Sequence, residues 1–97
     1  MDEIILKAIK EKKLIEFVYH GYIRIAEPHI YGMLNGKEQI LIFQIGGQSS
    51  TGNLPNWRRV QIDQISKLRM LDENFAGKRE NPSGEHSVWD KYYVIVS

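Results

Sequence analysis

The chain has 97 residues, with 13 Lys plus Arg, 12 Asp plus Glu and no cysteine, so its formal net charge is +1. This length suits one domain with one core, and 42% hydrophobic with 26% charged residues is typical of a folded protein rather than a disordered one. The composition excludes disulfides, thiolate metal sites and binding to nucleic acid by overall charge alone.

Membrane insertion and export are not expected. Residues 1–5 carry no basic region before a short apolar run, and no later segment approaches the roughly 20 apolar residues of a membrane span. We therefore expect a cytoplasmic protein with no membrane partner.

Residues 2–13 are predicted to form a helix. Asp2 suits the N-cap, and Ile5, Ala8 and Ile9 recur at helical spacing on the face that should meet the core. The end of this helix is rich in lysine, which suits the helix dipole, and an anion site is the alternative interpretation. These lysines are Lys7, Lys10, Lys12 and Lys13.

Two hairpins are predicted next. His20-Gly21 separates alternating residues 14–19 from 22–27, and Asn35-Gly36 separates 29–34 from the apolar run 39–45. Pro28 cannot donate to a sheet, so it should end its strand or lie on an edge. The continuous apolar character of Ile40 to Phe43 predicts a strand covered on both faces.

The second half is predicted to hold a loop and more strands. Residues 46–56 form the loop, either as a binding element or as a mobile hairpin tip. Residues 57–63 alternate, with Val60 and Ile62 on one face and Trp57, Arg59 and Gln61 on the other. A strand over 65–71, one helical turn over 72–75 with Phe75 anchored in the core, and a terminal strand over 88–96 follow.

Several short antiparallel strands within about 80 residues are too few for a two-layer sandwich. They predict a mainly β fold, a small antiparallel β-barrel whose N-terminal helix plugs one end. We expect one domain over residues 1–97.

Sets of residues in this order resemble motifs of the WYL domain family. They are Ala8-Ile9 with Ile15-Glu16-Phe17-Val18-Tyr19, then Arg24-Ile25-Ala26-Glu27-Pro28, then Ile40-Leu41-Ile42-Phe43, and finally Trp57 to Ile65 followed by Phe75. The resemblance covers about residues 3–79 and leaves 80–97 as a tail that ends in the terminal strand. The literal Trp-Tyr-Leu tripeptide is absent, and Gln61 and Gln64 stand where many members carry arginine.

The resemblance implies an Sm-like or SH3-like barrel in a compact, free-standing branch of the family. It also implies a sensory or regulatory role, often in bacterial transcription and phage-defence regulators, with a basic pocket for nucleic acid or nucleotide-like ligands.

No motif for catalysis or metal binding is visible. His20, His29 and His86 never pair at metal-binding spacing, no serine lies in a nucleophile elbow, and no glycine-rich phosphate motif occurs. We expect no catalytic residue, no metal, no cofactor and no enzyme.

The candidate ligand-binding residues fall into three chemical groups. Arginines can bind carboxylate or phosphate bidentately, aromatic rings can stack on bases, and neutral polar groups can add hydrogen bonds. These are Arg24, Arg58 and Arg59; Tyr19, Tyr31 and Trp57; and Gln44, Gln48 and Ser49. The alternative is that Trp57 and Tyr19 only pack, while each arginine pairs with Glu27 or Asp63 across the sheet.

The leading functional hypothesis is a non-enzymatic regulatory module that binds an anionic, nucleotide-like or single-stranded nucleic-acid ligand. The alternative is a protein-interaction or homo-oligomerisation module that uses a sheet edge or the aromatic tail from Trp89 to Val96.

Overall fold

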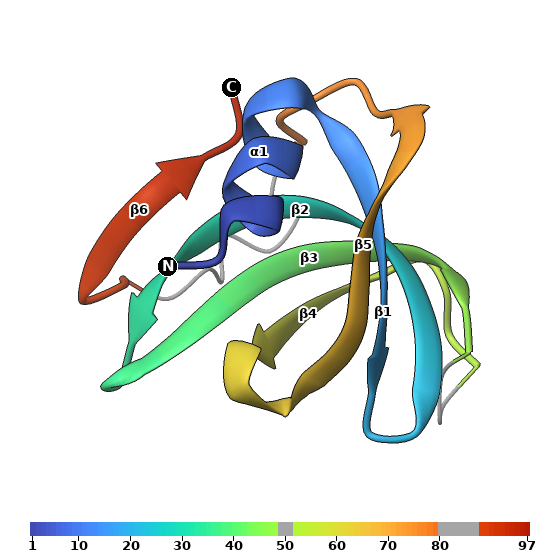
Figure 1. Cartoon of the computed structure of the whole chain (residues 1–97), viewed down its shortest axis with the longest axis horizontal. Coiled ribbons are helices and arrows are strands. Elements are labelled where there is room, and N and C mark those ends of the chain that lie inside the picture. The colour runs from blue at the N-terminus through green and yellow to red at the C-terminus, as the bar shows by residue number, and fades with distance from the viewer. Residues whose placement is uncertain (49–51, 80–87) are drawn as a thin grey trace.

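The computed structural model describes residues 1–48, 52–79 and 88–97. The elements in chain order are α1 (Glu3–Glu11), β1 (Lys13–Tyr19), β2 (Tyr22–Leu34), β3 (Lys37–Gly47), β4 (Asn56–Gln61), the 3-10 turn η1 (Ile62–Gln64), β5 (Ile65–Asn74) and β6 (Lys91–Ile95). Figure 1 shows a strongly curved sheet with α1 lying over it between β6 and β5. The predicted mainly β fold with an N-terminal helix is confirmed.

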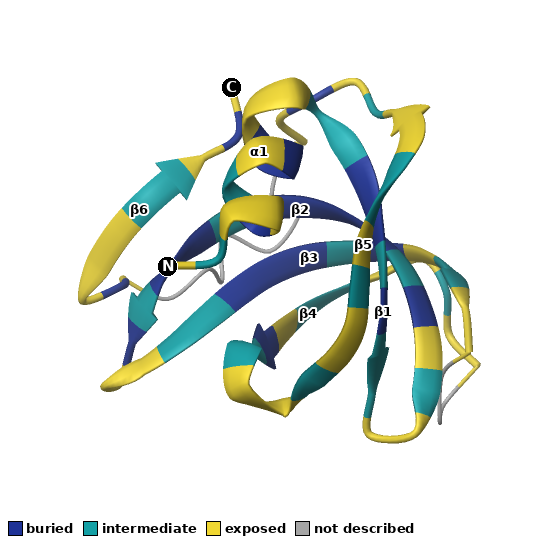
Figure 2. Cartoon of the chain, in the orientation of Figure 1, coloured by how far each residue is buried: buried dark blue, intermediate teal, exposed yellow. Residues whose placement is uncertain are grey.

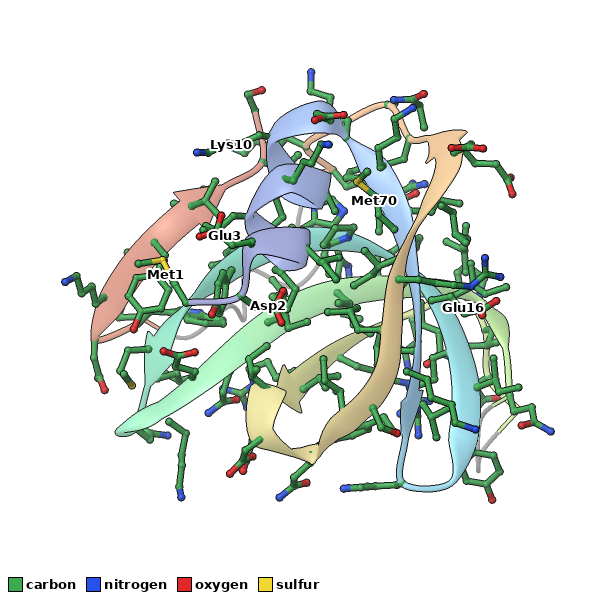
Figure 3. All side chains as sticks on the ribbon, in the orientation of Figure 1. Met1, Asp2, Glu3, Lys10, Glu16 and Met70 are labelled. Atoms are coloured by element: carbon green, nitrogen blue, oxygen red, sulfur yellow. The ribbon has the colours of Figure 1, made fainter. Side chains whose placement is uncertain are left out.

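The helix α1 forms as its sequence predicts. The Asp2 carboxylate accepts a hydrogen bond from the backbone N–H of Ile5 at 3.1 Å, and Lys12 ends the helix in the left-handed conformation. Asp2 lies at the start of α1, and Lys10 projects from the helix surface (Figure 3). Lys7 pairs with Glu11 at 3.9 Å, and Lys10 stands in the last turn, where it suits the helix dipole.

The three strands β1, β2 and β3 are joined by two tight turns at the predicted positions. The first turn contains His20 and Gly21 and the second contains Asn35 and Gly36, and all four residues have positive φ. Positive φ at both central residues defines the type I′ turn, whose twist matches that of an antiparallel pair. Both predicted hairpins are therefore confirmed.

The strand β2 continues through Pro28. Of the two predicted alternatives, a strand end is therefore wrong, and the edge position remains. Its pairing with β1 stops at Ala26 and its pairing with β6 starts at Ile30, so Pro28 has β3 alone as a paired neighbour among the described strands. The pairing with β3 also shifts between Pro28 and Ile30. A local edge and a bulge together accommodate a residue that has no N–H.

The strand β5 extends to Asn74, so the predicted helical turn over residues 72–75 is wrong. The β5 residue Asn74 pairs with Lys13 of β1, and its side chain donates to the backbone carbonyls of Glu11 and Lys12. Long-range contacts to the helix end therefore keep this polar segment extended. Phe75 packs against the core as predicted.

The sheet is not closed into the predicted barrel. The strand order is β4-β3-β2-β1-β5, and β6 pairs with β2 beside this path. The two ends of the path, β4 and β5, are joined along the chain by η1 and share no pairing among the described strands.

The main core lies inside the curve of the sheet, beneath α1. Figure 2 shows the buried residues along the middle of β1, β2 and β3 and on the sheet-facing side of α1. The core members are Ile5, Ala8, Ile9, Ile15, Phe17, Ala26, Tyr31, Ile40, Ile42, Val60 and Val96. In the part of the chain that the structure describes, no helix is long and apolar enough to cross a membrane.

A second apolar cluster lies on the outer face of β3. Leu41 packs there with Leu34 and Trp89, while its neighbours Ile40 and Ile42 face the main core. The predicted cover on both faces of this strand is confirmed, and the C-terminal segment supplies part of the outer cover.

Tyr31→Phe is expected to lower the free energy of unfolding by about 1–2 kcal/mol. The fully buried Tyr31 hydroxyl accepts from the backbone N–H of Asp2 at 2.8 Å and donates to the Glu38 carboxylate at 2.9 Å. Burial raises the pKa of Tyr31 to about 12, and the Glu38 carboxylate adds to that rise. Urea denaturation measures the loss.

Tyr93→Phe is the matched control, because the Tyr93 hydroxyl reaches the other oxygen of Glu38 at 3.5 Å, a weaker contact. Equal losses in the two variants would show that the Tyr31 hydroxyl, which bonds both to Asp2 at the start of α1 and to Glu38, stabilises the fold no more than the Tyr93 hydroxyl does.

Candidate anion-binding site

Arg24 occupies the inner face of β2, close to the first hairpin. It pairs in register with the core residue Phe17 and is 4% exposed. Its Nε and Nη2 atoms both donate to the backbone carbonyl of Tyr19 at 3.3 Å, and its Nη1 donates to Oε1 of Gln44 at 3.1 Å. The guanidinium is thus held in one orientation by neighbouring strands.

Two tyrosine rings flank the Arg24 guanidinium. Its Cζ lies 5.2 Å from the ring centroid of Tyr19 and 5.7 Å from that of Tyr22, both within the range of a cation–π interaction. The Tyr19 ring also stacks on His20 with centroids 3.9 Å apart. The half-buried Tyr19 therefore lies between Arg24 and the first hairpin turn.

The acceptors of Arg24 in the described structure are all neutral. No salt bridge within residues 1–48, 52–79 and 88–97 includes Arg24. The alternative in which it pairs with Glu27 is wrong, because Glu27 receives bonds from Arg79 and His29 instead. Arg24 is a buried cation with no carboxylate partner there.

Arg58 brings a second positive charge to the same face. Its strand pairs with β3, with Arg58 opposite Ile42 and Val60 opposite Ile40, so Arg58 shares the inner side with these core residues. Burial lowers the pKa of Arg24 below its usual value, and the nearby charge of Arg58 lowers it further.

Gln44 and Gln48 complete this group. Gln44 is fully buried, and its Nε2 donates to the carbonyls of Gly46 at 3.0 Å and Gln48 at 2.9 Å. The Gln48 backbone N–H donates to the carbonyl of Ile23, and its side-chain oxygen accepts from the N–H of Ile23. We call Tyr19, Arg24, Gln44, Gln48 and Arg58 the Arg24 site.

A glycine at position 47 makes this arrangement possible. Gly47 has φ +82°, and a Cβ at this position would overlap the backbone carbonyl oxygen of Ile23. The chain can therefore pass close to β2 between Gln44 and Gln48 only with glycine at this point.

The other candidate residues do not join the Arg24 site. Trp57 and Arg59 alternate with Arg58 along β4 and face the outer side, where Trp57 contacts Phe43 and the ring of His29. Tyr31 lies seven positions beyond Arg24 on β2, in the core beside α1. Ser49 lies outside the described residues.

A second buried polar cluster was missed by the sequence interpretation. Glu27, 3% exposed, accepts from Nε and Nη2 of Arg79 at 2.7 and 2.8 Å, and one of its oxygens lies 3.0 Å from Nε2 of His29. Arg79 also lies over the ring of Phe43, 4.4 Å from its centroid. Glu27 and His29 are two residues apart on one strand, so the sequence could have predicted that they share a face. The sequence could not predict the bond to Arg79, which is 52 positions away.

The described residues contain no group of three or more His, Asp or Glu side chains arranged to hold a metal. His20 bonds to Gln64 at 2.9 Å, His29 bonds to Glu27, and His86 lies outside the described residues. Gln64 in turn donates to Gln61, so these two glutamines bond to each other beside the first hairpin.

A hollow of about 300 Å³ lies at the opposite end of β2, between the second turn and η1. Its lining carries both signs of charge, from Lys37, Glu38 and Asp63, together with Met33, Gly36 and Ile62. Such mixed charge does not select an anion, so this hollow is not the candidate site.

Comparison with models of known protein families, with curated proteins and with solved structures finds no match for this chain.

Proposed function

We propose that this chain is a non-enzymatic regulatory module of the WYL type, which binds an anionic, nucleotide-like or single-stranded nucleic-acid ligand at the Arg24 site. The observation that carries the proposal is the burial of the Arg24 guanidinium with neutral acceptors only. The other members of the site are supporting groups.

Burial makes the charge on Arg24 costly. A buried charge is normally paired, because the protein interior solvates it far less well than water does. The neutral acceptors at Tyr19 and Gln44 satisfy three N–H bonds and leave the charge itself uncompensated in the described structure. An anionic ligand would supply the counter-charge, with Arg58 as a second donor.

The aromatic neighbours favour a ligand that carries a base. Tyr19 and Tyr22 lie beside the guanidinium at the first hairpin, and His20 stacks on Tyr19. Stacking of a base on an aromatic side chain contributes about 1–3 kcal/mol and tolerates any sequence. This combination of cation and ring supports a nucleotide-like ligand over a simple inorganic anion.

The sheet order supports the proposed family. The first strand β1 pairs with both β2 and β5, which brings the early and late strands together after an N-terminal helix. We propose that this curved sheet is an open form of the Sm-like or SH3-like barrel that the resemblance to WYL domains implies.

Arg58→Gln is expected to weaken the binding of a short single-stranded oligonucleotide about tenfold, or roughly 1.4 kcal/mol. The variant removes one charge that the proposal places against a phosphate, so the salt dependence of binding should also fall by about one counterion. Fluorescence anisotropy at a series of salt concentrations measures both effects.

Arg59→Gln is the matched control, because it removes the same charge from the next residue of β4 on the opposite face. Equal weakening by both variants would indicate diffuse charge attraction and would contradict the Arg24 site. Failure of the wild-type protein to bind oligonucleotides or mononucleotides at low salt would contradict the proposed function itself.

A second candidate function is association through the sheet edges. In the part of the chain that the structure describes, β4 and β5 each have one paired neighbour, and such edges can accept a strand from another chain. Trp89 from the aromatic tail is 4% exposed and packs within its own chain, so it is not available for docking. A monomer at all concentrations in light scattering would contradict self-association.

A further inference from the structure

Gln44 is fully buried and makes three hydrogen bonds within the Arg24 site. Its two donor bonds to the carbonyls of Gly46 and Gln48 fix which way the amide points, so its Oε1 must face Arg24. That oxygen lies 3.1 Å from Nη1 of Arg24, at the place where a paired carboxylate would stand. A glutamate would put a negative charge there with almost the same shape.

The other buried cluster of this chain, around Glu27, provides a comparison for the contact between Arg24 and Gln44. At its second buried cluster, the guanidinium of Arg79 receives a carboxylate partner, Glu27, in a bidentate ion pair. At the Arg24 site the more deeply buried guanidinium receives an amide instead. The two sites therefore differ in whether the protein supplies the counter-charge.

We infer that Gln44 is the specificity-determining residue of the Arg24 site, because its amide orients the Arg24 guanidinium while leaving the positive charge for an anionic oxygen group of the ligand, such as a phosphate. This inference rests on the proposed function. The same amide also donates to the backbone carbonyls of Gly46 and Gln48. The orientation of Arg24 therefore depends on the backbone at the start of the connection between β3 and β4.

Gln44→Glu tests the inference, with a mononucleotide and a short single-stranded oligonucleotide as probes at low salt. We expect the variant to melt at a higher temperature than Gln44→Met, because both variants lose the donor bonds to Gly46 and Gln48 but only glutamate gives Arg24 a counter-ion within the protein. We expect its affinity for both probes to fall at least about tenfold, because the carboxylate competes with the ligand.

Gln64→Glu is the matched control for added charge, because Gln64 lies outside the Arg24 site, beside the first hairpin. Gln64 is exposed, and its side-chain oxygen lies 2.9 Å from Nε2 of His20, a contact that a carboxylate can also make. This control should weaken binding by less than about threefold. Equal weakening by the two variants would overturn the inference, since charge near the site would then suffice.

Gln44→Met separates charge from structure. Methionine loses the same donor bonds as glutamate but adds no charge, so Gln44→Met should bind both probes at least about threefold more tightly than Gln44→Glu. Equal binding by the two variants would overturn the inference, because the loss would then come from structure alone.

The outcomes distinguish the inference from the proposed function. Wild-type protein that binds neither probe would contradict the function. If Gln44→Glu still melted at a higher temperature than Gln44→Met in that case, Gln44 would keep its role in withholding the counter-charge. Wild-type protein that binds both probes while Gln44→Glu binds them equally well would contradict the inference alone.

Discussion

Gly32→Ala is expected to detach β6 from β2 and to lower the free energy of unfolding by about 3–5 kcal/mol. A Cβ at position 32 would overlap the backbone carbonyl oxygen of Lys91 and lie 3.2 Å from the Cα of Tyr92. The backbone of β6 must therefore move away. Its departure would expose Trp89 and Val96, which are both 4% exposed in the folded chain.

Urea denaturation measures the loss, and hydrogen exchange at the amides of Lys91–Ile95 locates it. Gly46→Ala is the control, because the nearest atom to its new Cβ is a side-chain carbon of Ile25 at 3.6 Å, an ordinary contact. Protected β6 amides and an unchanged urea midpoint in Gly32→Ala would show that β2 and β6 accommodate the added methyl group without separating, and would contradict the prediction.

Glu27→Gln is expected to lower the free energy of unfolding by about 2 kcal/mol at pH 7 and to have progressively less effect as the pH falls below the ordinary pKa of glutamate. Burial tends to raise the pKa of Glu27, but the hydrogen bonds from Arg79 and His29 outweigh it and hold the pKa below its usual value. Ionised Glu27 therefore stabilises the fold above its ordinary pKa of about 4.3. That contribution disappears as the pH falls through the lowered value, so wild type and variant should converge in acid.

The magnitude follows from the surroundings of the carboxylate. The Glu27 side chain is buried while that of Arg79 is 47% exposed, so the arginine can return to water when its partner is lost. Glu16→Gln is the control, because Glu16 pairs with Arg69, whose side chain is 63% exposed, and such pairs contribute about 1 kcal/mol or less. Equal losses at Glu27 and Glu16, or a gap that persists in acid, would contradict the assignment.

Local chemistry made much of the fold predictable. Asp2 at the helix start and the two dipeptides that require positive φ place α1, β1, β2 and β3 within a residue or two of the structure. The wrong helical turn over residues 72–75 came from contacts that are distant in sequence, because Asn74 is held extended by bonds to the end of α1. The sequence alone could not decide between the two alternatives for Pro28, because the gap that β1 and β6 leave beside it depends on distant strands.

The alternation of side chains along each strand predicts which candidate residues face the core, and this part of the site was predictable from the sequence. Arg24 and Gln44 face the core side of their strands, and both lie in the Arg24 site. The same alternation already separated Arg59 and Trp57 from Val60, so grouping them with Arg58 went against the pattern. Tyr31 could not be separated from the Arg24 site by sequence alone, because its position depends on the register of β2 beyond the bulge at Pro28 to Ile30, which no local sequence signal predicts.

The long strand β2 changes its pairing partner at Pro28. Residues before it pair with β1 and carry Arg24, whereas residues after Pro28 fasten β6 and the segment that contains Trp89. The two halves share β3 but have different neighbours on their other side. Substitutions in the last ten residues should therefore leave the Arg24 guanidinium in place, and substitutions around Arg24 should leave β6 paired with β2.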